Sequence, residues 1–339
     1  MQKRSFLLLV GATILLVAAA AYALATGDRA ITAAPDAQRV FPQLAAHLGD
    51  LAWMRISHGA TKADFNLIGG RWTVVEKGNY PAAPGKVRRL LLGLAELTLV
   101  EPKTTRPELF GRLDLDDPSN GKSTLVALQD RTGKAVAELI VGKMRHDRLG
   151  GGNDAVYLRK PREDQTWLAR GSLDLPPAMV DWLDRRIIDL PAARIDSVSL
   201  TAFDGAVLAL RRDPADGKFV VADPPEGAKF KDAAVAAPAA ALAGLDLDDV
   251  KPAAALHPPS TGSAMAAFIA SDGLAVTLRL FTSGEADWVT LSATGSGAAE
   301  KAAAALNAKL SHWAYRIPAE RAKLLRTKLG DLVEPQKGS

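Results

Sequence analysis

The 339-residue chain contains no cysteine. This absence excludes disulfide bonds, thiolate nucleophiles, cysteine-ligated zinc and a lipid anchor attached to a cysteine. An exported protein of this composition needs no oxidative folding, because it has no thiols to pair.

The chain also has little excess of charge of either sign. It carries 42 lysines and arginines against 38 aspartates and glutamates, a net charge of +4. The two signs are mixed along the sequence, whereas nucleic-acid-binding proteins usually concentrate lysine and arginine in runs or on one face. We therefore expect no nucleic-acid partner.

Motifs for catalysis and metal binding are equally scarce. No two histidines have a metal-ligand spacing with a glutamate, and no Gly-x-Ser-x-Gly motif is present. The glycine-rich stretch at Arg148–Asp154 lacks the Lys-Ser or Lys-Thr that follows in a phosphate-binding loop. The sequence predicts a protein without enzymatic activity and without a cofactor.

Three carboxylates in "LDLDDPSNGKS" (Leu113–Ser123) are the weak candidates for a metal site. Asp114, Asp116 and Asp117 supply the oxygen atoms that Ca²⁺ prefers, but no glutamate follows at the final EF-hand position. Asp-Pro-Ser-Asn-Gly is also a common turn sequence, so a turn is the preferred interpretation.

The amino terminus carries a long uncharged run. Lys3 and Arg4 precede Phe6–Ala25, whose twenty residues contain no charge. As a helix this run is roughly 30 Å long, the thickness of a bilayer's hydrocarbon core. We expect residues 1–26 to be a single-pass inner-membrane anchor that leaves the bulk of the chain outside the cytoplasm. The alternative is a signal peptide cleaved after "ALA" at Ala23–Ala25.

One hairpin pattern occurs twice. "ALQDRTGKAVAELIVG" (Ala127–Gly142) and "FIASDGLAVTLRLFTSG" (Phe268–Gly284) each contain an apolar run, a polar turn with glycine and an alternating run. Three short strand-like runs precede each hairpin, in Leu51–Glu76 and in Arg194–Ala222. The sequence predicts a linker (residues 27–50) and two tandem duplicated modules, residues 51–191 and 192–335.

Helical patterns follow the strands of each predicted module. Pro84 precedes an apolar stripe in the first module, and Asp232–Ala243 takes the corresponding place in the second. Pro176–Pro191 and Asn307–Glu320 each predict a terminal amphipathic helix, with Trp182 and Trp313 as counterparts. Both tryptophans are interpreted as core anchors, with an exposed binding surface as the alternative. The fold class is therefore α+β, each module being an antiparallel sheet with helices packed on one side.

Several stretches resemble a bacterial family known as domain of unknown function 4340. They are "GGRWTVVEKGNYPAAPGKVRRLLLGLAELTLVEP", "FGRLDLDDPSNGKSTLVALQDRTGKAVAELIVGK", "AVYLR" and "DWLDRRIIDLP". The resemblance covers about Leu51–Pro191 and continues weakly into the second half. It implies a single-anchor envelope protein associated with ABC transport systems of the gliding-motility type, and it carries over no catalytic residues.

The sequence thus predicts a non-enzymatic, membrane-anchored accessory subunit of an ABC-type transport system, in contact with the membrane through residues 6–25 and with transporter subunits. One rival hypothesis is an envelope protein that binds a glycan or lipid between its modules. The other is a hydrolase whose dispersed site escapes motif reading.

Overall fold

The computed structural model describes residues 38–120, 122–146, 154–258 and 263–334. The predicted anchor at Phe6–Ala25 and the glycine-rich residues 148–153 lie outside these ranges. Within them, no helix combines the length and apolar character needed to cross a membrane.

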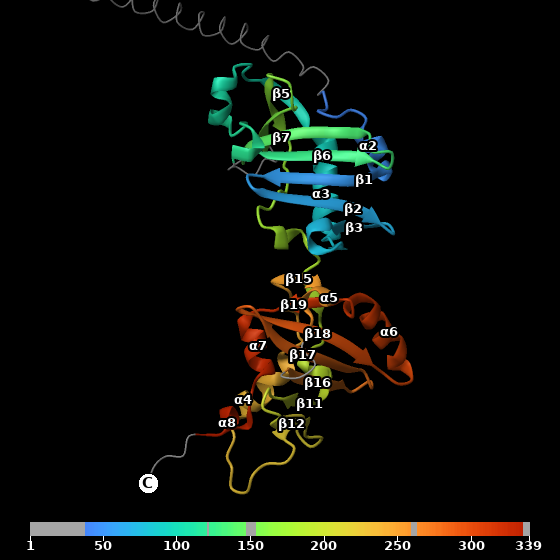
Figure 1. The fold of residues 1–339 in the computed structure, drawn as a ribbon, viewed down its shortest axis with the longest axis vertical. Coiled ribbons are helices and arrows are strands. Elements are labelled where there is room, and N and C mark those ends of the chain that lie inside the picture. The colour runs from blue at the N-terminus through green and yellow to red at the C-terminus, as the bar shows by residue number, and fades with distance from the viewer. Residues whose placement is uncertain (1–37, 121, 147–153, 259–262, 335–339) are drawn as a thin grey trace, which may run out of the picture.

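The first half of the chain forms a nine-stranded sheet, and every pair of neighbours is antiparallel (Figure 1). Its order is β4-β3-β2-β1-β6-β7-β8-β9-β5. The predicted first hairpin is present as β6 and β7. The strands are β1 (Leu51–His58), β2 (Thr61–Ile68), β3 (Arg71–Val74), β4 (Tyr80–Pro81), β5 (Thr98–Pro102), β6 (Thr124–Asp130), β7 (Ala135–Arg145), β8 (Ala155–Arg159) and β9 (Thr166–Arg170).

Helix α3 (Pro84–Glu96) forms where its apolar stripe predicts a helix. Proline occupies the first turn, where its missing N–H costs no helical hydrogen bond. The stripe is buried in the same core as one face of the sheet, and its residues are Val87, Leu90, Leu91 and Leu94. The short segments around α3 are α2 (Leu44–His47) and the 3₁₀ turns η2 (Leu48–Asp50), η3 (Val75–Lys77), η4 (Pro107–Leu113) and η5 (Pro118–Asn120).

The second half forms an eight-stranded sheet in the order β13-β12-β11-β16-β17-β18-β19-β15. Its strands are β11 (Ile195–Thr201), β12 (Val207–Arg212), β13 (Phe219–Val221), β15 (Asp249–Pro252), β16 (Ala264–Ala270), β17 (Ala275–Ser283), β18 (Ala286–Thr294) and β19 (Trp313–Arg316). The remaining elements are β10 (Arg186–Ile188), β14 (Leu245–Asp246), α4 (Asp232–Ala236), α5 (Ala253–Leu256), α6 (Ala298–Leu310), α7 (Ala319–Leu325), α8 (Leu329–Leu332), η6 (Met179–Trp182), η7 (Ala192–Arg194) and η8 (Ala237–Ala240).

The two sheets list their strands in the same order once β4 is set aside. The first sheet then runs β3-β2-β1-β6-β7-β8-β9-β5, and the second runs β13-β12-β11-β16-β17-β18-β19-β15. Each strand of the second sheet takes the place of its counterpart in the first. In this comparison β19 corresponds to β9. Trp167 lies opposite Pro102 in the first sheet, and Trp313 lies opposite Pro252 in the second.

Three predicted helices are wrong in part or whole. Residues 176–191 form the 3₁₀ turn η6 and strand β10, and residues 307–320 contain the end of α6, strand β19 and the start of α7. Helix α6 ends at Leu310, and Pro318 lies immediately before α7, at its N-cap. In residues 232–243 only α4 is α-helical, because Pro238 supplies no N–H for a longer helix. The pairing of Trp182 with Trp313 is also wrong, because strand order pairs Trp313 with Trp167.

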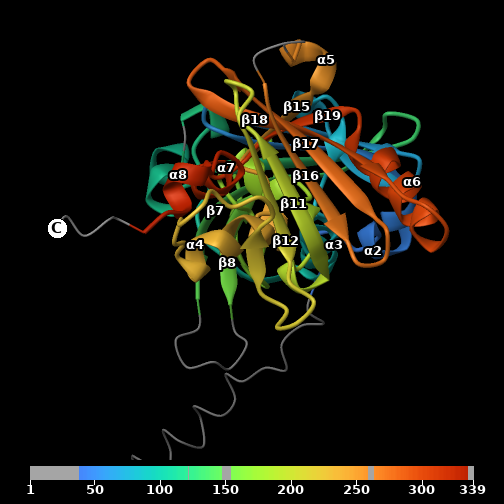
Figure 2. The same cartoon turned by 90° about the horizontal axis from the view of Figure 1, so that it is seen from below.

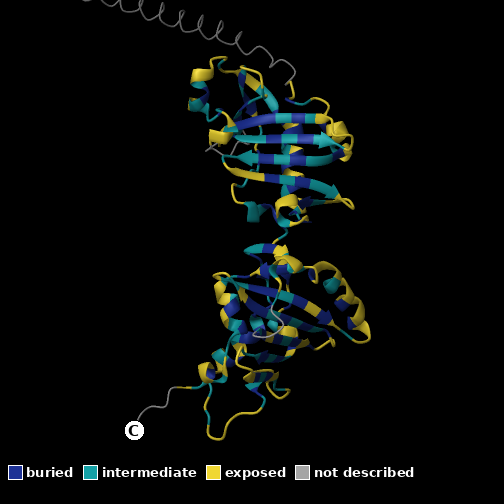
Figure 3. Ribbon diagram, in the orientation of Figure 1, coloured by how far each residue is buried: buried dark blue, intermediate teal, exposed yellow. Residues whose placement is uncertain are grey.

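The two halves are stacked along the long axis of the molecule and meet at a junction where β3 and β4 lie near β15 and β19 (Figure 1). Lys77 Nζ lies 2.6 Å from Asp249 Oδ1. The Tyr80 and Trp313 rings make an edge contact with centroids 5.0 Å apart. One continuous hydrophobic cluster contains buried residues of both sheets, and Figure 3 shows buried positions along the strands of both.

The connector Leu183–Leu190 runs between the sheets and bonds to both. The amide of Asp184 donates to the Pro81 carbonyl of the first sheet. On the other side, the Leu247 amide donates to the Arg185 carbonyl, and β10 pairs with β14. The connector is therefore part of the packed structure.

Candidate functional site

The three candidate metal-binding aspartates do not converge. Asp114 ends η4 in a left-handed conformation, with its carboxylate 4.0 Å from Lys143 Nζ. The Asp117 carboxylate accepts hydrogen bonds from the hydroxyl and amide of Ser119, which lower its pKa. Asp116 accepts a hydrogen bond through its carbonyl, from the Ser123 hydroxyl. Among the residues in the described ranges, no group of three or more histidine, aspartate or glutamate side chains could hold a metal ion.

The two candidate tryptophans have different surroundings. Trp182 is 2% exposed, its indole N–H donates to the Pro176 carbonyl, and its ring contacts Phe65 edge-on. Trp313 is half-buried at the junction against Tyr80. The Trp182 ring is therefore a core residue, and the Trp313 ring remains partly exposed.

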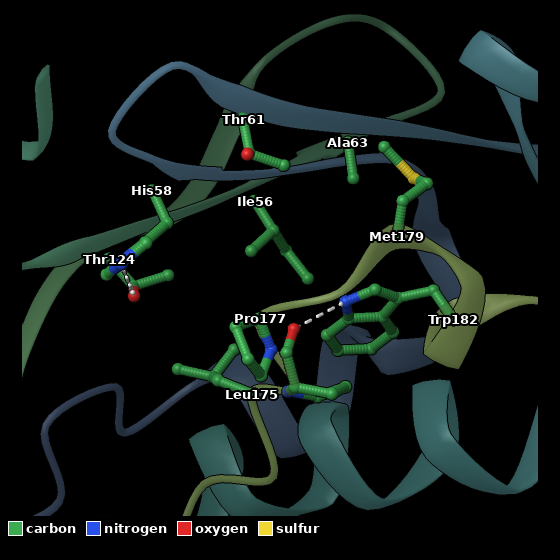
Figure 4. A pocket seen from close by; sticks show the side chains of 10 residues that line it. Ile56, His58, Thr61, Ala63, Thr124, Leu175, Pro177, Met179 and Trp182 are labelled. Carbon is green, nitrogen blue, oxygen red and sulfur yellow. Dashed lines mark hydrogen bonds between the residues drawn. The ribbon is translucent and has the colours of Figure 1, made fainter. Parts of the chain in front are cut away.

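A small cavity opens beside Trp182, between strands β1, β2 and β6 and the segment at residues 175–182 (Figure 4). Its volume is about 70 Å³. The lining side chains are Ile56, His58, Thr61, Ala63, Thr124, Leu175, Pro176, Pro177, Met179 and Trp182. His58 Nδ1 lies 3.1 Å from both the Ser123 carbonyl and the Thr124 hydroxyl, so this nitrogen is occupied by local bonds.

The size of this cavity limits its chemistry. Sites for drug-sized ligands usually enclose roughly 300–1,000 Å³. The cavity beside Trp182 therefore accommodates one small apolar group, and it is too small for a glycan or a lipid chain. With His58 as its only titratable group, it lacks the paired acid and base of a hydrolase.

A larger surface lies on the second sheet, across β12, β11, β16, β17 and β18, which Figure 2 shows side by side. Cross-strand pairing places three rows of side chains on one face of these strands. We call this surface the open face. Its rows are Val207-Thr201-Met265-Arg279-Thr290, Ala209-Ser199-Ala267-Thr277-Ser292 and Arg211-Ser197-Ile269-Ala275-Thr294.

The open face is accessible and almost uncharged. None of its residues is buried, whereas their neighbours on the opposite face, such as Val198 and Leu278, are. Val207, Met265 and Ile269 are 64, 42 and 48% exposed. Arg211 and Arg279 carry the only charges in its rows, and neither has an ion-pair partner in the part of the chain that the structure describes.

The corresponding face of the first sheet carries paired charges and is partly covered. Arg55 Nε lies 2.6 Å from Asp64 Oδ1, and the Arg55 guanidinium also stacks over Trp53. Phe110 and Leu115, in and beside η4, cover part of this face. Arg55 and Asp64 thus pair within the first sheet, whereas Arg211 and Arg279 of the open face have no ion-pair partner among the described residues.

Sequence reasoning did not identify the open face. The strand "SVSLT" (Ser197–Thr201) alternates large buried residues with serine and threonine. In "AMAAFIA" (Ala264–Ala270), buried positions alternate with the accessible Met265, Ala267 and Ile269. The alternation itself was readable. Which strands lie side by side, and hence which exposed residues form one surface, follows only from the sheet order.

Comparison with known proteins gave one match. Residues 72–262, more than half of the chain, match the sequence model of a family described as "Domain of unknown function (DUF4340)". The matched range begins in β3 of the first sheet and ends after α5 in the second half, so it includes the junction. No curated protein and no solved structure matches the chain.

Proposed function

The chain belongs to the DUF4340 family, and on this premise we propose that it is a non-enzymatic, membrane-anchored interaction protein. Its role is that of an accessory subunit of an ABC-type transport system in the cell envelope. The open face is the observation that carries the proposal, because exposed apolar residues gathered on one surface are typical of interaction sites.

The two halves have different tasks in this proposal. They arose by duplication of one sheet unit, as the shared strand order supports. The first copy, with its internally paired charges, serves as a spacer. The second copy lost those charges and became the interacting unit.

The arrangement along the chain supports a spacer. The second sheet lies at the opposite end of the molecule from α2, which follows the predicted anchor in sequence (Figure 1). With Phe6–Ala25 in the membrane, the first sheet holds the open face away from the bilayer. The packed junction fixes the direction in which the open face points.

Site-specific photo-crosslinking tests whether the open face is an interaction surface. A photoreactive amino acid replaces Ala267, in the middle row of the open face. The matched control replaces Ala127, which occupies the same place in the first sheet, between Arg55 and Glu138. We expect protein adducts from position 267 only. An Ala267 derivative that forms no adduct in cells would show that the open face is not used.

Purification of the full chain in mild detergent tests the accessory role. We expect the membrane subunits of an ABC transporter to copurify with it. Mass spectrometry of the amino terminus tests the anchor, which requires the mature chain to retain Phe6–Ala25. A mature chain that starts at Thr26 would contradict membrane anchoring.

A further inference from the structure

We propose that the partner on the open face is a second copy of this chain, packed face to face in a twofold dimer. This inference rests on the proposed function, since it takes the open face as an interaction surface and names its occupant. Twofold dimers are the commonest protein assemblies, and their interface must be complementary to itself.

The positions of the two arginines make the open face compatible with its own copy. Arg211 and Arg279 lie at diagonally opposite corners of the block formed by β12, β11, β16 and β17. A twofold axis along the strands places Arg211 opposite Ala275 and Arg279 opposite Val207. A twofold axis across the strands places Arg211 opposite Val207 and Arg279 opposite Ala275. Neither arrangement brings two arginines together.

The side chains between the arginines permit close packing. The middle row consists of alanine, serine and threonine, and the larger Met265 and Ile269 lie in the two outer rows. Two pleated sheets normally pack about 10 Å apart at an angle near 30°. With an axis across the strands, Met265 of one copy lies opposite Ile269 of the other, which buries both.

The size of the open face predicts a weak dimer. Five strands about 4.8 Å apart and three rows along them give roughly 500 Å² per copy. The total of roughly 1,000 Å² is at the lower limit for a specific interface. Anchoring both copies in one membrane raises their effective concentration and compensates for weak contacts. The first sheet cannot form the same face-to-face dimer. A second copy of that sheet would place additional charges opposite Asp64 and Glu138.

Because the natural chain contains no cysteine, one introduced thiol reports on one position. The test uses the full chain in its native membrane, with Ala267→Cys and, as the matched control, Ala127→Cys. Both variants are treated with a short bifunctional maleimide. We expect Ala267→Cys to form a covalent homodimer and Ala127→Cys to remain a monomer.

A third variant combines Ala267→Cys with Met265→Lys and Ile269→Lys. Both added lysines replace exposed residues, so the fold is retained, but each copy now presents like charges to the other. We expect the yield of covalent dimer to fall at least tenfold. An unchanged yield would overturn the proposal, because the dimer would then use another surface.

The outcomes separate this inference from the proposed function. If position 267 forms photo-adducts only with other proteins and no thiol homodimer, the second copy is excluded and the interaction function stands. If position 267 gives neither product, both proposals fail. Equal homodimer yields from Ala267→Cys and Ala127→Cys would show random collision in the membrane and would overturn the dimer.

Discussion

Trp182 joins the segment that follows the first sheet to the sheet itself. Its ring is buried against Phe65, and its N–H is satisfied by Pro176. Truncation of a buried tryptophan typically costs about 3–5 kcal/mol, because it leaves a cavity as well as losing contacts. We expect Trp182→Ala to lower the free energy of unfolding by this amount, measured by urea denaturation with circular dichroism.

Trp53 provides the matched control for this prediction. It is another tryptophan of the first half, on β1, but its ring lies on the outer face under the Arg55 guanidinium. Exposed cation–π pairs contribute about 0.5–1 kcal/mol. Trp53→Ala should therefore cost no more than about 1 kcal/mol, and equal losses in the two variants would show that Trp182 is not a core residue.

The burial of individual residues was only partly readable from the sequence. Trp72 and Val74 share a strand face, as alternation predicts, yet Val74 is fully buried and Trp72 only half-buried. The difference follows from their positions along β3. Trp72 lies opposite Leu67 beside the hairpin turn, whereas Val74 lies opposite the buried Phe65 and Tyr80. Alternation gives the face of a residue, and its cross-strand neighbours decide how deeply it is covered.

A side chain of helix α6 forms hydrogen bonds with the backbone of β18 at a position that no strand among the described residues pairs on that side. Asn307 on α6 accepts a hydrogen bond from the Ala293 amide at 2.8 Å and donates one to the Ala293 carbonyl at 2.7 Å. The side-chain amide thus makes the two backbone hydrogen bonds that a neighbouring strand would otherwise make. Loss of both bonds in Asn307→Ala should cost about 1–3 kcal/mol, since it leaves partly buried backbone groups unpaired.

Lys301→Ala on the same helix is the control for Asn307→Ala. Lys301 is exposed, and alanine is an equal or better helix former. We expect its midpoint of urea denaturation to remain within error of the natural chain. If Asn307→Ala behaves like Lys301→Ala, water satisfies the Ala293 backbone equally well.

The elements that could be predicted from the sequence are those with an unambiguous period. Helix α3 has a proline start and a complete apolar stripe, and the hairpins alternate on both sides of a glycine turn. The terminal helices were mispredicted because apolar residues at three- and four-residue spacing in 176–191 also fit a tight turn followed by a short strand. A run of this length fits both the helical and the strand period, and pairing with β14 selects the strand.

At the scale of the whole molecule, Gly78 determines how closely the two sheets approach. Its φ is +68°, and a Cβ atom there would lie 2.7 Å from Pro252 Cγ of the second sheet. Gly69 has a similar φ of +57°, but a Cβ atom there would meet nothing within 4 Å. Gly69→Ala should cost about 1–2 kcal/mol from the left-handed backbone alone.

We expect Gly78→Ala to cost at least about 1 kcal/mol more than Gly69→Ala, because overpacking of the junction adds to the backbone strain. Urea denaturation of both variants measures the difference. Equal costs would mean that the junction yields to an added methyl group without strain.

Two buried tyrosines make the junction sensitive to alkaline pH. Burial raises the pKa of Tyr80, with a further contribution from the negative charge of Asp184, and burial beside Tyr80 raises the pKa of Tyr315. In the unfolded chain both lose their protons near pH 10. Because the folded state keeps them protonated, the stability that they contribute is complete below about pH 10 and falls as the pH rises further.

The free energy of unfolding should therefore decrease between about pH 9 and 11, and less steeply in the Tyr80→Phe/Tyr315→Phe double variant. Loss of the Tyr80 bond to the Asp184 carbonyl lowers the stability of the variant at every pH, but it does not change the slope. Parallel slopes in the two proteins would show that other groups titrate in this range.

The packed connector also determines where a protease can cut the chain. Proteases need a segment that can leave the surface and extend into their active site, and in two-part proteins that segment is usually the link between the parts. Here Arg185 and Arg186 expose their side chains to trypsin, but their backbone is held between the sheets, and Leu183 and Ile187 beside them are buried. Limited trypsin digestion should therefore spare this stretch, and a fragment ending at Arg185 or Arg186 should appear only under conditions that unfold the protein. Such resistance would mean that the halves are degraded together, so the cell cannot retain the first sheet after damage to the second.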